Sequence, residues 1–374
     1  MLRMTLFVTI VVTIYTAMHL AVFVGMRPLL AGRPVLRDAL IAWMVLMILA
    51  PFSVRLLERA GLESGARLGA LVGYCWLGFV FLAFCGFIAV FVWDLGSWLV
   101  HRLQPAVPLH LHGTAATAAV LGLSLVACLY GLGEAYRLRI ERLTLPMTKL
   151  SAGAGKIRVV QISDLHLGLI HRRAFLRRVV SRIEALRPDL LVATGDIVDA
   201  QINHLDGLAE LLAGVHAPLG KFAVTGNHEY YAGIEQARDF IRRADFVLLE
   251  GQSVELPNGL RIAGVSDPAG GDTADEGALL SGAPARLTLL LKHRPRIATA
   301  ALDRFDLQLS GHAHRGQIFP FNLVTHLEYP LQDGFYRLPE GAALYTSRGT
   351  GTWGPPMRIF APPEITLIRL VPTH

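Results

Sequence analysis

Charged residues are scarce in this chain, and cysteine is scarcer still. Only 17% of its 374 residues are Asp, Glu, Lys or Arg, and the mean hydropathy is +0.45. This composition is too apolar for a single soluble globule, whereas the length allows a membrane part followed by a full globular domain. Cys75, Cys85 and Cys128 all lie in long apolar runs. The rest of the chain therefore has neither a disulfide framework nor thiolate ligands for a metal.

A basic stripe is missing as well. The formal net charge is +6, but the Lys and Arg residues are spread along the chain rather than gathered in a stripe with aromatic residues. We therefore expect no nucleic-acid partner. Anionic lipid headgroups or phosphorylated substrates are the better expectation for a chain of this charge.

Four long apolar runs occupy the first third of the chain. They cover residues 4–26, 39–54, 68–93 and 114–133, and runs of this length cross a bilayer as helices. The second run is the shortest and carries Pro51 near its end. The first is long and is followed at once by Arg27, which favours a membrane anchor over a cleaved signal peptide. Residues 1–136 are thus predicted to form a helical domain with about four transmembrane spans.

The distribution of basic residues predicts the orientation of these spans. With four spans, the amino terminus, the loop at 55–67 and the globular part share one side of the membrane. The basic residues on that side are Arg3, Arg55, Arg59, Arg67, Arg137, Arg139, Arg142 and Lys149, against Arg27, Arg33, Arg37 and Arg102 on the other. The positive-inside rule then places the globular part in the cytoplasm, although one span fewer would reverse this result.

A basic segment connects the two parts. Residues 137–149 interleave basic residues with Leu and Ile, which predicts a helix lying at the membrane surface. Residues 151–155, rich in Gly and Ala, are then a short linker. The interpretation divides the chain into a membrane domain, a juxtamembrane segment at 137–155 and a globular α/β domain at 156–374.

Candidate ligands follow the predicted strands of the globular part. Open α/β sheets bind their ligands at the carboxyl ends of the strands. Asp164 and His166 follow the first buried strand and, being two residues apart, are expected to point the same way. The residues that follow the five predicted strands are Asp164 and His166, Asp196, Asn227 and His228, His293, and His312 and His314.

These residue types together point to metal chemistry. Oxygen donors mixed with imidazoles, without thiolate, suit Mn, Fe or Zn. The set is large enough for two divalent ions that share a carboxylate, an arrangement that promotes in-line displacement at phosphorus. Each residue alone also has an ordinary explanation: Asp196 as a turn cap, His293 as a core residue, His312 and His314 as a solvated turn. Chance does not account for a ligand type at every strand end.

The ordered blocks resemble the signature of the calcineurin-like metallophosphoesterase superfamily. The blocks are Asp164-x-His166, Gly195-Asp196, Gly226-Asn227-His228-Glu229, His293 and Gly311-His312-x-His314. The resemblance implies two mixed β-sheets in a sandwich flanked by helices, with two metal ions at one end. It implies that Asp164, His166 and His314 hold one ion, that Asn227, His293 and His312 hold the other, and that Asp196 bridges them. His228 is then the residue that stabilises the transition state or protonates the leaving oxygen, with a metal-bound hydroxide as nucleophile.

The carboxyl-terminal part narrows the resemblance. Residues 347–356 and 362–365 are similar to the bacterial membrane-associated branch that contains the YkuE and YaeI proteins, and also to the chlamydial-type UDP-2,3-diacylglucosamine pyrophosphatases. The four predicted spans differ from the secreted member of this branch, which carries a twin-arginine signal. With a bacterial resemblance and four spans, we expect a multi-pass protein of the bacterial cytoplasmic (inner) membrane.

Three functions are compatible with the sequence. The first is hydrolysis of a phosphodiester or pyrophosphate bond in a lipid-linked substrate, with the apolar stretch 318–335 facing acyl chains or else packed on the domain's own core. The second is a tethered phosphatase or nucleotide phosphodiesterase for soluble substrates, and the third is a non-catalytic membrane scaffold. Arg315, Gln317 and Arg348 are predicted to contact the substrate phosphate. The sequence does not predict the oligomeric state.

Overall fold

The computed structural model describes residues 2–103, 110–151, 153, 155–199, 205, 207–271, 274–282 and 286–373. The chain divides into two compact units. One comprises residues 1–133 with 354–357, and the other residues 134–353 with 358–374.

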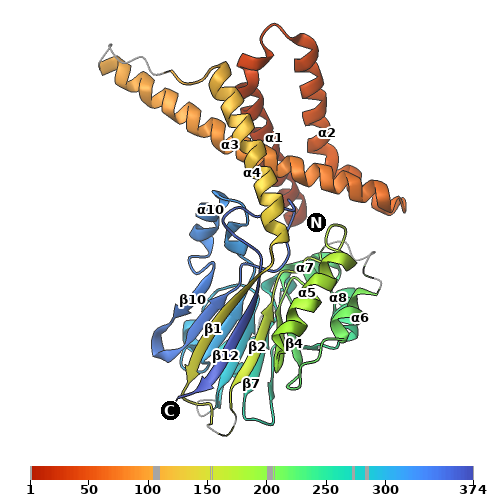
Figure 1. The fold of residues 1–374 in the computed structure, drawn as a ribbon, viewed down its shortest axis with the longest axis vertical. Helices are drawn as coiled ribbons and strands as arrows, with labels where there is room; N and C mark the ends of the chain where they lie inside the picture. Colours follow the sequence, from red (N-terminus) through yellow and green to blue (C-terminus); the bar gives the residue numbers. More distant parts are fainter. Residues whose placement is uncertain are drawn as a thin grey trace. The chain divides into compact units, whose positions relative to one another are not determined.

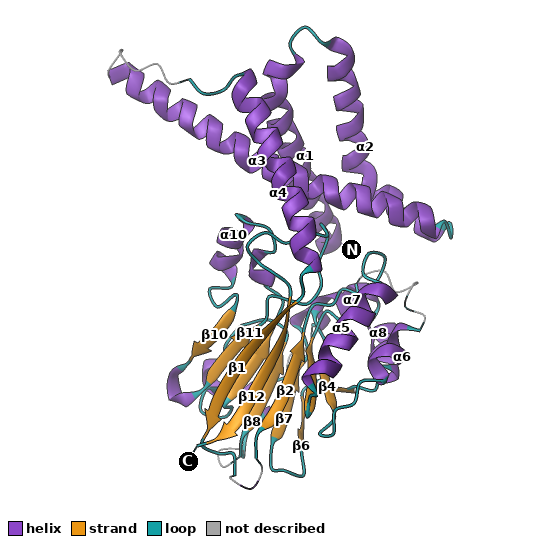
Figure 2. Ribbon diagram, viewed as in Figure 1, coloured by secondary structure: helices purple, strands orange, loops and turns teal. Residues whose placement is uncertain are grey.

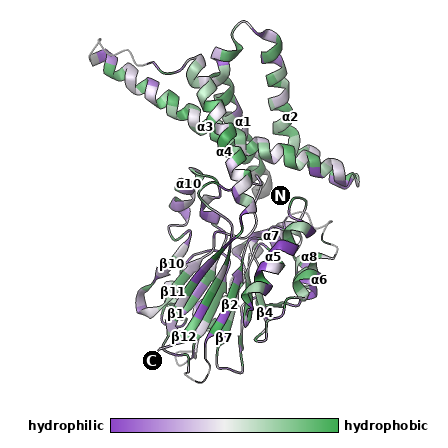
Figure 3. Cartoon of the chain, in the orientation of Figure 1, coloured by the Kyte–Doolittle hydropathy of each residue, from purple (hydrophilic) through white to green (hydrophobic). Residues whose placement is uncertain are grey.

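Long apolar helices make up the first unit (Figures 1 and 3). They are α1 (Leu2–Leu30), α2 (Pro34–Arg59), α3 (Glu63–Leu103) and α4 (Thr114–Tyr136). Each is long and apolar enough to cross a membrane, which confirms the four predicted spans. The second helix is longer than its apolar run because Pro34 starts it at a position where the missing N–H costs nothing. Gly25 of α1 leaves room for the ring of Phe87 on α3, as small residues do where membrane helices pack closely.

The predicted helix at residues 137–149 is wrong. Residues Arg139–Met147 form strand β1, which pairs in parallel with β12 (Glu364–Pro372). Leu143, Leu145 and Met147 alternate with polar or exposed residues, which is the period of a strand, and the side chains of Leu145 and Met147 are buried. Ala152 and Ala154 of the predicted linker lie outside the described residues.

Two six-stranded mixed sheets form the second unit (Figure 2). The first has the order β1-β12-β2-β3-β4-β5 and the second β10-β11-β9-β8-β7-β6. The remaining strands of the first sheet are β2 (Ile157–Ile162), β3 (Leu190–Thr194), β4 (Lys221–Val224) and β5 (Val247–Leu248). Those of the second are β6 (Gln252–Glu255), β7 (Arg261–Val265), β8 (Thr288–Lys292), β9 (Leu307–Ser310), β10 (Gly334–Arg337) and β11 (Ala343–Thr346).

The main core lies between the two sheets. Val159 and Val192 of the first sheet belong to one buried cluster with Leu289 and Leu309 of the second. A separate cluster joins the other face of the first sheet to helices, through residues such as Ile183 and Phe240. The helices of this unit are α5 (Arg173–Leu186), α6 (Leu208–Ala213), α7 (Asn227–Ala232), α8 (Ile234–Arg243), α9 (Glu276–Leu279) and α10 (Phe321–Glu328). The predicted sandwich of two mixed sheets flanked by helices is confirmed.

Strand direction brings the candidate ligands together. Strands β2, β3 and β4 are mutually parallel, as are β8 and β9. The chain therefore leaves several strands of each sheet at one edge, and the predicted ligands follow at those ends.

Candidate metal centre

Asp164 and His166 lie in a turn beyond the end of β2, which stops at Ile162. Both have positive φ, 53° and 47°, a left-handed backbone that is uncommon for residues other than glycine. Asp196, His312 and His314 share this conformation. The alternation of a strand, from which the sequence argument started, is thus not what brings Asp164 and His166 together. Turns of this kind cost free energy and concentrate at functional sites.

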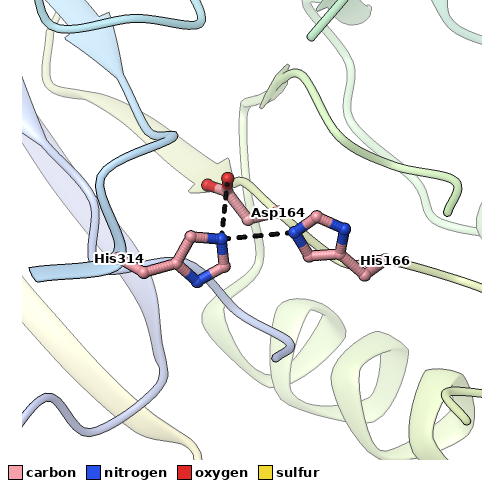
Figure 4. A group of neighbouring side chains, drawn as sticks. All are labelled: Asp164, His166 and His314. Atoms are coloured by element: carbon pink, nitrogen blue, oxygen red, sulfur yellow. Dashed lines mark hydrogen bonds and ion pairs between the residues drawn. The ribbon is translucent and has the colours of Figure 1, made fainter. Parts of the chain in front are cut away.

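The first cluster consists of Asp164, His166 and His314 (Figure 4). His314 Nε2 lies 3.2 Å from Asp164 Oδ1 and 3.2 Å from His166 Nε2. All three side chains are buried. Two imidazole nitrogens this close attract each other only if a proton or a cation lies between them. The cluster therefore fits a cation held by one oxygen and two nitrogens.

The second cluster consists of Asp196, His293 and His312. His293 Nε2 lies 3.2 Å from Asp196 Oδ2 and 3.1 Å from His312 Nδ1. Asn227 Oδ1 is buried and, among the described residues, accepts no hydrogen bond. A buried polar atom without a protein partner is rare in native proteins and points to a bound ion or water. The donor set fits a second divalent cation.

Asp196 links the two clusters. Its Oδ2 atom is 3.2 Å from His293 Nε2 and 4.0 Å from His166 Nε2. The residue also forms a ligand-type group with His166 and His228. One carboxylate within reach of both clusters is the arrangement that two ions sharing a ligand require.

The pKa values of the histidines are strongly displaced. Burial lowers the pKa of His166 and of His312 to about 3, so both rings are neutral and able to bind a metal. Burial also opposes protonation of His293, but the nearby Asp196 carboxylate raises its pKa to about 10. A cation held by His293 would take the place of that proton, so metal binding is expected to release a proton.

His228 follows Asn227 at the start of α7. Its backbone N–H donates to Asp196 Oδ1 (2.8 Å), and its ring Nδ1 donates to Asp199 Oδ1 (2.9 Å). Burial lowers the pKa of His228, but Asp196 and Asp199 outweigh it and raise the pKa to about 9. Asp199 therefore orients the imidazole through Nδ1 and leaves Nε2 as the ring nitrogen available for proton exchange.

Glu229 fixes the turn that carries Asp196. Its buried carboxylate accepts the backbone N–H groups of Asp196, Ile197, Val198 and Gly226, at 2.6 to 3.2 Å. Burial and the neighbouring Asp196 raise the pKa of Glu229 to about 7. Sequence reasoning gave neither Asp199 nor Glu229 a role. The signals for them were the acid three residues after Asp196 and the acid that ends the Gly226-Asn227-His228-Glu229 block.

Arg358 is a residue of this site to which the sequence analysis assigned no role. Its side chain is fully buried and donates to the carbonyl of Arg348 (2.7 Å), and it lies 3.0 Å from His314 Nδ1. This guanidinium holds the loop that follows β11 against the candidate ligand His314. A basic residue between two loops carries no periodic signal, so the sequence alone did not indicate it.

Gly226 lies directly against the Asp196 carboxylate. A Cβ atom at Gly226 would collide with the Asp196 side chain and backbone. We expect Gly226→Ala to displace Asp196 and to lower metal affinity by about tenfold or more, measured by elemental analysis after gel filtration. Gly214→Ala is the control, because a Cβ there meets nothing closer than 3.7 Å. A full metal content in Gly226→Ala would contradict the placement of Asp196.

Tyr329 supports the candidate ligand His312. The hydroxyl of Tyr329 is 3.0 Å from His312 Nε2, while Nδ1 of the same ring faces His293. A histidine that binds a metal through one ring nitrogen is oriented by a hydrogen bond at its other ring nitrogen. Loss of that hydrogen-bond partner costs about 10–100-fold in metal affinity. We therefore expect Tyr329→Phe to weaken one of two Mn²⁺ binding steps in calorimetry by this factor. Tyr336→Phe serves as control, and equal weakening of both steps would argue against a local effect.

The three residues predicted to contact substrate occupy different environments. Arg348 forms salt bridges with Glu364 and Glu141. Gln317 is buried, and its amide forms two hydrogen bonds with the backbone of Trp353. The Arg315 side chain is 42% exposed and lies 3.5 Å from Asp333. Substrate contact by these residues stays a prediction, and Arg315 is the most exposed of them.

Comparisons with known proteins agree with this geometry. The sequence model of the family described as calcineurin-like phosphoesterase matches residues 157–316. An uncharacterized metallophosphoesterase from Aquifex aeolicus is 41% identical over 244 residues, 63% of this chain and 93% of that protein.

Two further relatives have informative names. A transmembrane protein with metallophosphoesterase domain from Danio rerio is 33% identical over 272 residues; the match covers 68% of this chain and only 62% of that protein. The UDP-2,3-diacylglucosamine pyrophosphatase LpxG from Chlamydia trachomatis is 30% identical over 293 residues, 62% of this chain and 89% of that protein. Together with the two clusters and their shared carboxylate, these matches show that the chain belongs to the calcineurin-like phosphoesterase family.

Proposed function

We propose that this protein is a membrane-anchored phosphoesterase that uses two divalent metal ions to hydrolyse a phosphodiester or pyrophosphate bond in a lipid-linked substrate. The observation that carries the lipid part of the proposal is an exposed apolar surface that follows the metal-ligand loop in the chain. This surface, here called the α10 surface, consists of Phe319, Phe321, Leu323, Val324, Leu327 and Phe360.

The α10 surface is unusually apolar for a region in contact with water. Leu327 is 83% exposed and Leu323 is 61% exposed, and the rings of Phe319 and Phe360 lie 5.7 Å apart. Soluble proteins rarely expose contiguous apolar patches, and such patches mark lipid or protein binding. Of the two interpretations of residues 318–335, this exposure favours acyl-chain contact over packing on the core.

The α10 surface is also joined to the metal centre. Helix α10 begins at Phe321, shortly after the loop that carries the ligand His314. Tyr329, the residue that follows the helix, meets the ligand His312. A substrate whose acyl chains rest on α10 would thus have its phosphate held near the ligand clusters.

The chemistry follows from the residues at the two clusters. Asp164, His166 and His314 are assigned to one ion, Asn227, His293 and His312 to the other, and Asp196 to both. When bound, such ions supply Lewis-acid charge and lower the pKa of water. His228, held through Nδ1 by Asp199, is assigned to stabilise the developing charge and to give a proton to the leaving oxygen.

Two other lines of support concern substrate and location. LpxG is named for a substrate that joins a nucleotide to an acylated sugar through a pyrophosphate, which is the type of bond proposed here. The four apolar helices and the resemblance of residues 347–356 to a bacterial membrane-associated branch support the bacterial inner membrane as the location, and the distribution of Arg and Lys around the helices supports the cytoplasmic side for the phosphoesterase unit.

The proposal is tested on membrane lipids. Purified detergent-solubilised protein loaded with Mn²⁺ is incubated with a membrane lipid extract, and phosphorus NMR is compared with that of an Asp196→Asn sample. We expect one phosphodiester or pyrophosphate signal to disappear only with the unaltered protein. Turnover of soluble nucleotides or phosphoproteins, with none of the lipid extract, would select a tethered soluble-substrate enzyme instead.

Variants of α10 test the role of the apolar surface. The double variant Leu323→Ser with Leu327→Ser is expected to raise KM for the lipid substrate about tenfold or more, since each buried leucine contributes about 1.5–3 kcal/mol. Hydrolysis of bis(p-nitrophenyl) phosphate is the reference reaction, and Val247→Ser, at an exposed apolar residue of β5, is the matched control. Equal losses on both substrates would refute a lipid-specific role.

A further inference from the structure

Two exposed aromatic rings flank His228. The ring centroids of Tyr231 and Trp353 lie 5.4 Å and 5.9 Å from that of His228, both in edge-to-face geometry. Tyr231 is 58% exposed and Trp353 is 55% exposed. Tryptophan is highly buried on average in folded proteins, so a half-exposed ring beside the proton-donating residue calls for an explanation.

Both rings are displayed on a fixed backbone. Tyr231 lies in α7, one turn after His228. Trp353 is held by Gln317, whose Nε2 donates to the Trp353 carbonyl (2.8 Å) and whose Oε1 accepts the Trp353 N–H (2.9 Å). The preceding residue, Thr352, donates its backbone N–H to His171 Nε2 (3.0 Å). These hydrogen bonds hold the backbone at Thr352 and Trp353 in place, while the ring of Trp353 stays exposed.

We propose that Trp353 and Tyr231 form a stacking site for the nucleobase of a nucleotide-linked substrate. The proposal rests on the proposed function, because the role of His228 defines where the leaving group lies. Every nucleobase has a planar aromatic face that stacks on tryptophan or tyrosine, whichever base it is. Each such contact contributes measurably to binding. The α10 surface then accommodates the acyl chains, and the aromatic pair accommodates the nucleoside of the same substrate.

The aromatic pair gives a selectivity for substrate that the metal clusters do not provide. The two clusters bind any phosphate ester, so they do not distinguish a nucleotide from another headgroup. Two aromatic rings beside the leaving-group histidine favour a substrate that carries a flat heteroaromatic ring over one that carries glycerol, choline or ethanolamine.

Fluorescence tests the site without turnover. Trp353 is the only tryptophan in residues 134–374; the others, Trp43, Trp76, Trp93 and Trp98, lie in the membrane part. The full-length Mn²⁺-loaded protein, reconstituted in lipid nanodiscs, is titrated with UMP and, separately, with ribose 5-phosphate. We expect saturable quenching by UMP alone, and its loss in Trp353→Phe, which keeps a ring but removes the fluorophore.

A kinetic measurement gives a second readout. The substrate is UDP-glucose, and UMP release is followed by chromatography. Trp353→Ala and Tyr231→Ala are each expected to raise KM about fivefold to a hundredfold with a smaller change in kcat, consistent with the energy of one base–aromatic stack. Trp353→Phe is expected to recover most of the loss in KM. A loss confined to kcat would indicate a structural role of the loop and refute stacking.

The outcomes separate this site from the function on which it rests. Quenching by brominated lipids in the nanodisc, with none by UMP, would make Trp353 a membrane-interface anchor and overturn the stacking site. Hydrolysis of the lipid extract without any response to UMP would leave the proposed function standing and refute the nucleobase site. Binding of UMP without lipid hydrolysis would refute the lipid-linked substrate alone.

Discussion

Replacing Asp196 by asparagine is expected to lower kcat by more than about a hundredfold and to remove at least one metal ion. The carboxylate lies within reach of both clusters, at 3.2 Å from His293 Nε2 and 4.0 Å from His166 Nε2. An amide keeps the size of the side chain but loses the charge that balances two cations. Loss of a supporting residue already costs about 10–100-fold, so loss of the shared ligand is expected to cost more than about a hundredfold in kcat.

The measurement combines kinetics with elemental analysis of the same sample. Asp303→Asn is a suitable control because this carboxylate is 67% exposed and lies outside both clusters. Thermal unfolding of both variants shows whether the fold survives. Full activity of a folded Asp196→Asn protein would be incompatible with a shared carboxylate.

The second large effect is expected for His228→Ala. His228 is oriented by Asp199 through a 2.9 Å hydrogen bond and lies beside the ligand His166, with ring centroids 4.6 Å apart. Loss of a positioned proton donor typically costs about 10²–10⁴-fold in rate. We expect kcat to fall by this amount while both metal ions stay bound, and Asp199→Asn to show a smaller loss of the same kind.

Metal content decides between two roles of His228. The residue also groups with His166 and Asp196 at ligand distance, so a role as a metal ligand has to be tested. Loss of a metal ion from His228→Ala would make the residue a ligand. His216→Ala, at an exposed histidine, controls for the removal of an imidazole as such.

The positions of the candidate ligands could be predicted because a polar residue able to bind a metal follows each short apolar run. The apolar run of β2 before Asp164 and that of β3 before Asp196 are visible by eye. Parallel strand direction then brings these ends to one edge without further information. The four membrane helices could be predicted from the length of their apolar runs, whereas the two-sheet architecture followed from the resemblance of the ligand blocks to a known superfamily.

Other features depend on partners that are distant in the chain. Tyr329 contacts His312 and Arg358 contacts His314, and no local sequence pattern predicts either contact. The left-handed turns at Asp164 and His166 arise because the surrounding loops hold them, not because the residues favour them. Strand β1 was mistaken for a helix because its arginines suggested a membrane surface, although its apolar residues already alternated with polar ones.

Strand β1 determines when the connection between the membrane helices and the phosphoesterase unit becomes part of the sheet. Helix α4 ends at Tyr136 and β1 begins at Arg139, so the covalent path from the bilayer to the phosphoesterase unit runs through this strand. In its sheet β1 pairs only with β12, over a register from Arg139 and Glu364 to Met147 and Pro372, among the residues that the structure describes. During synthesis this anchoring ladder forms only after β12 has emerged, long after β1 itself. The connection between the two units is therefore secured by this ladder only once the carboxyl-terminal strand has joined the sheet.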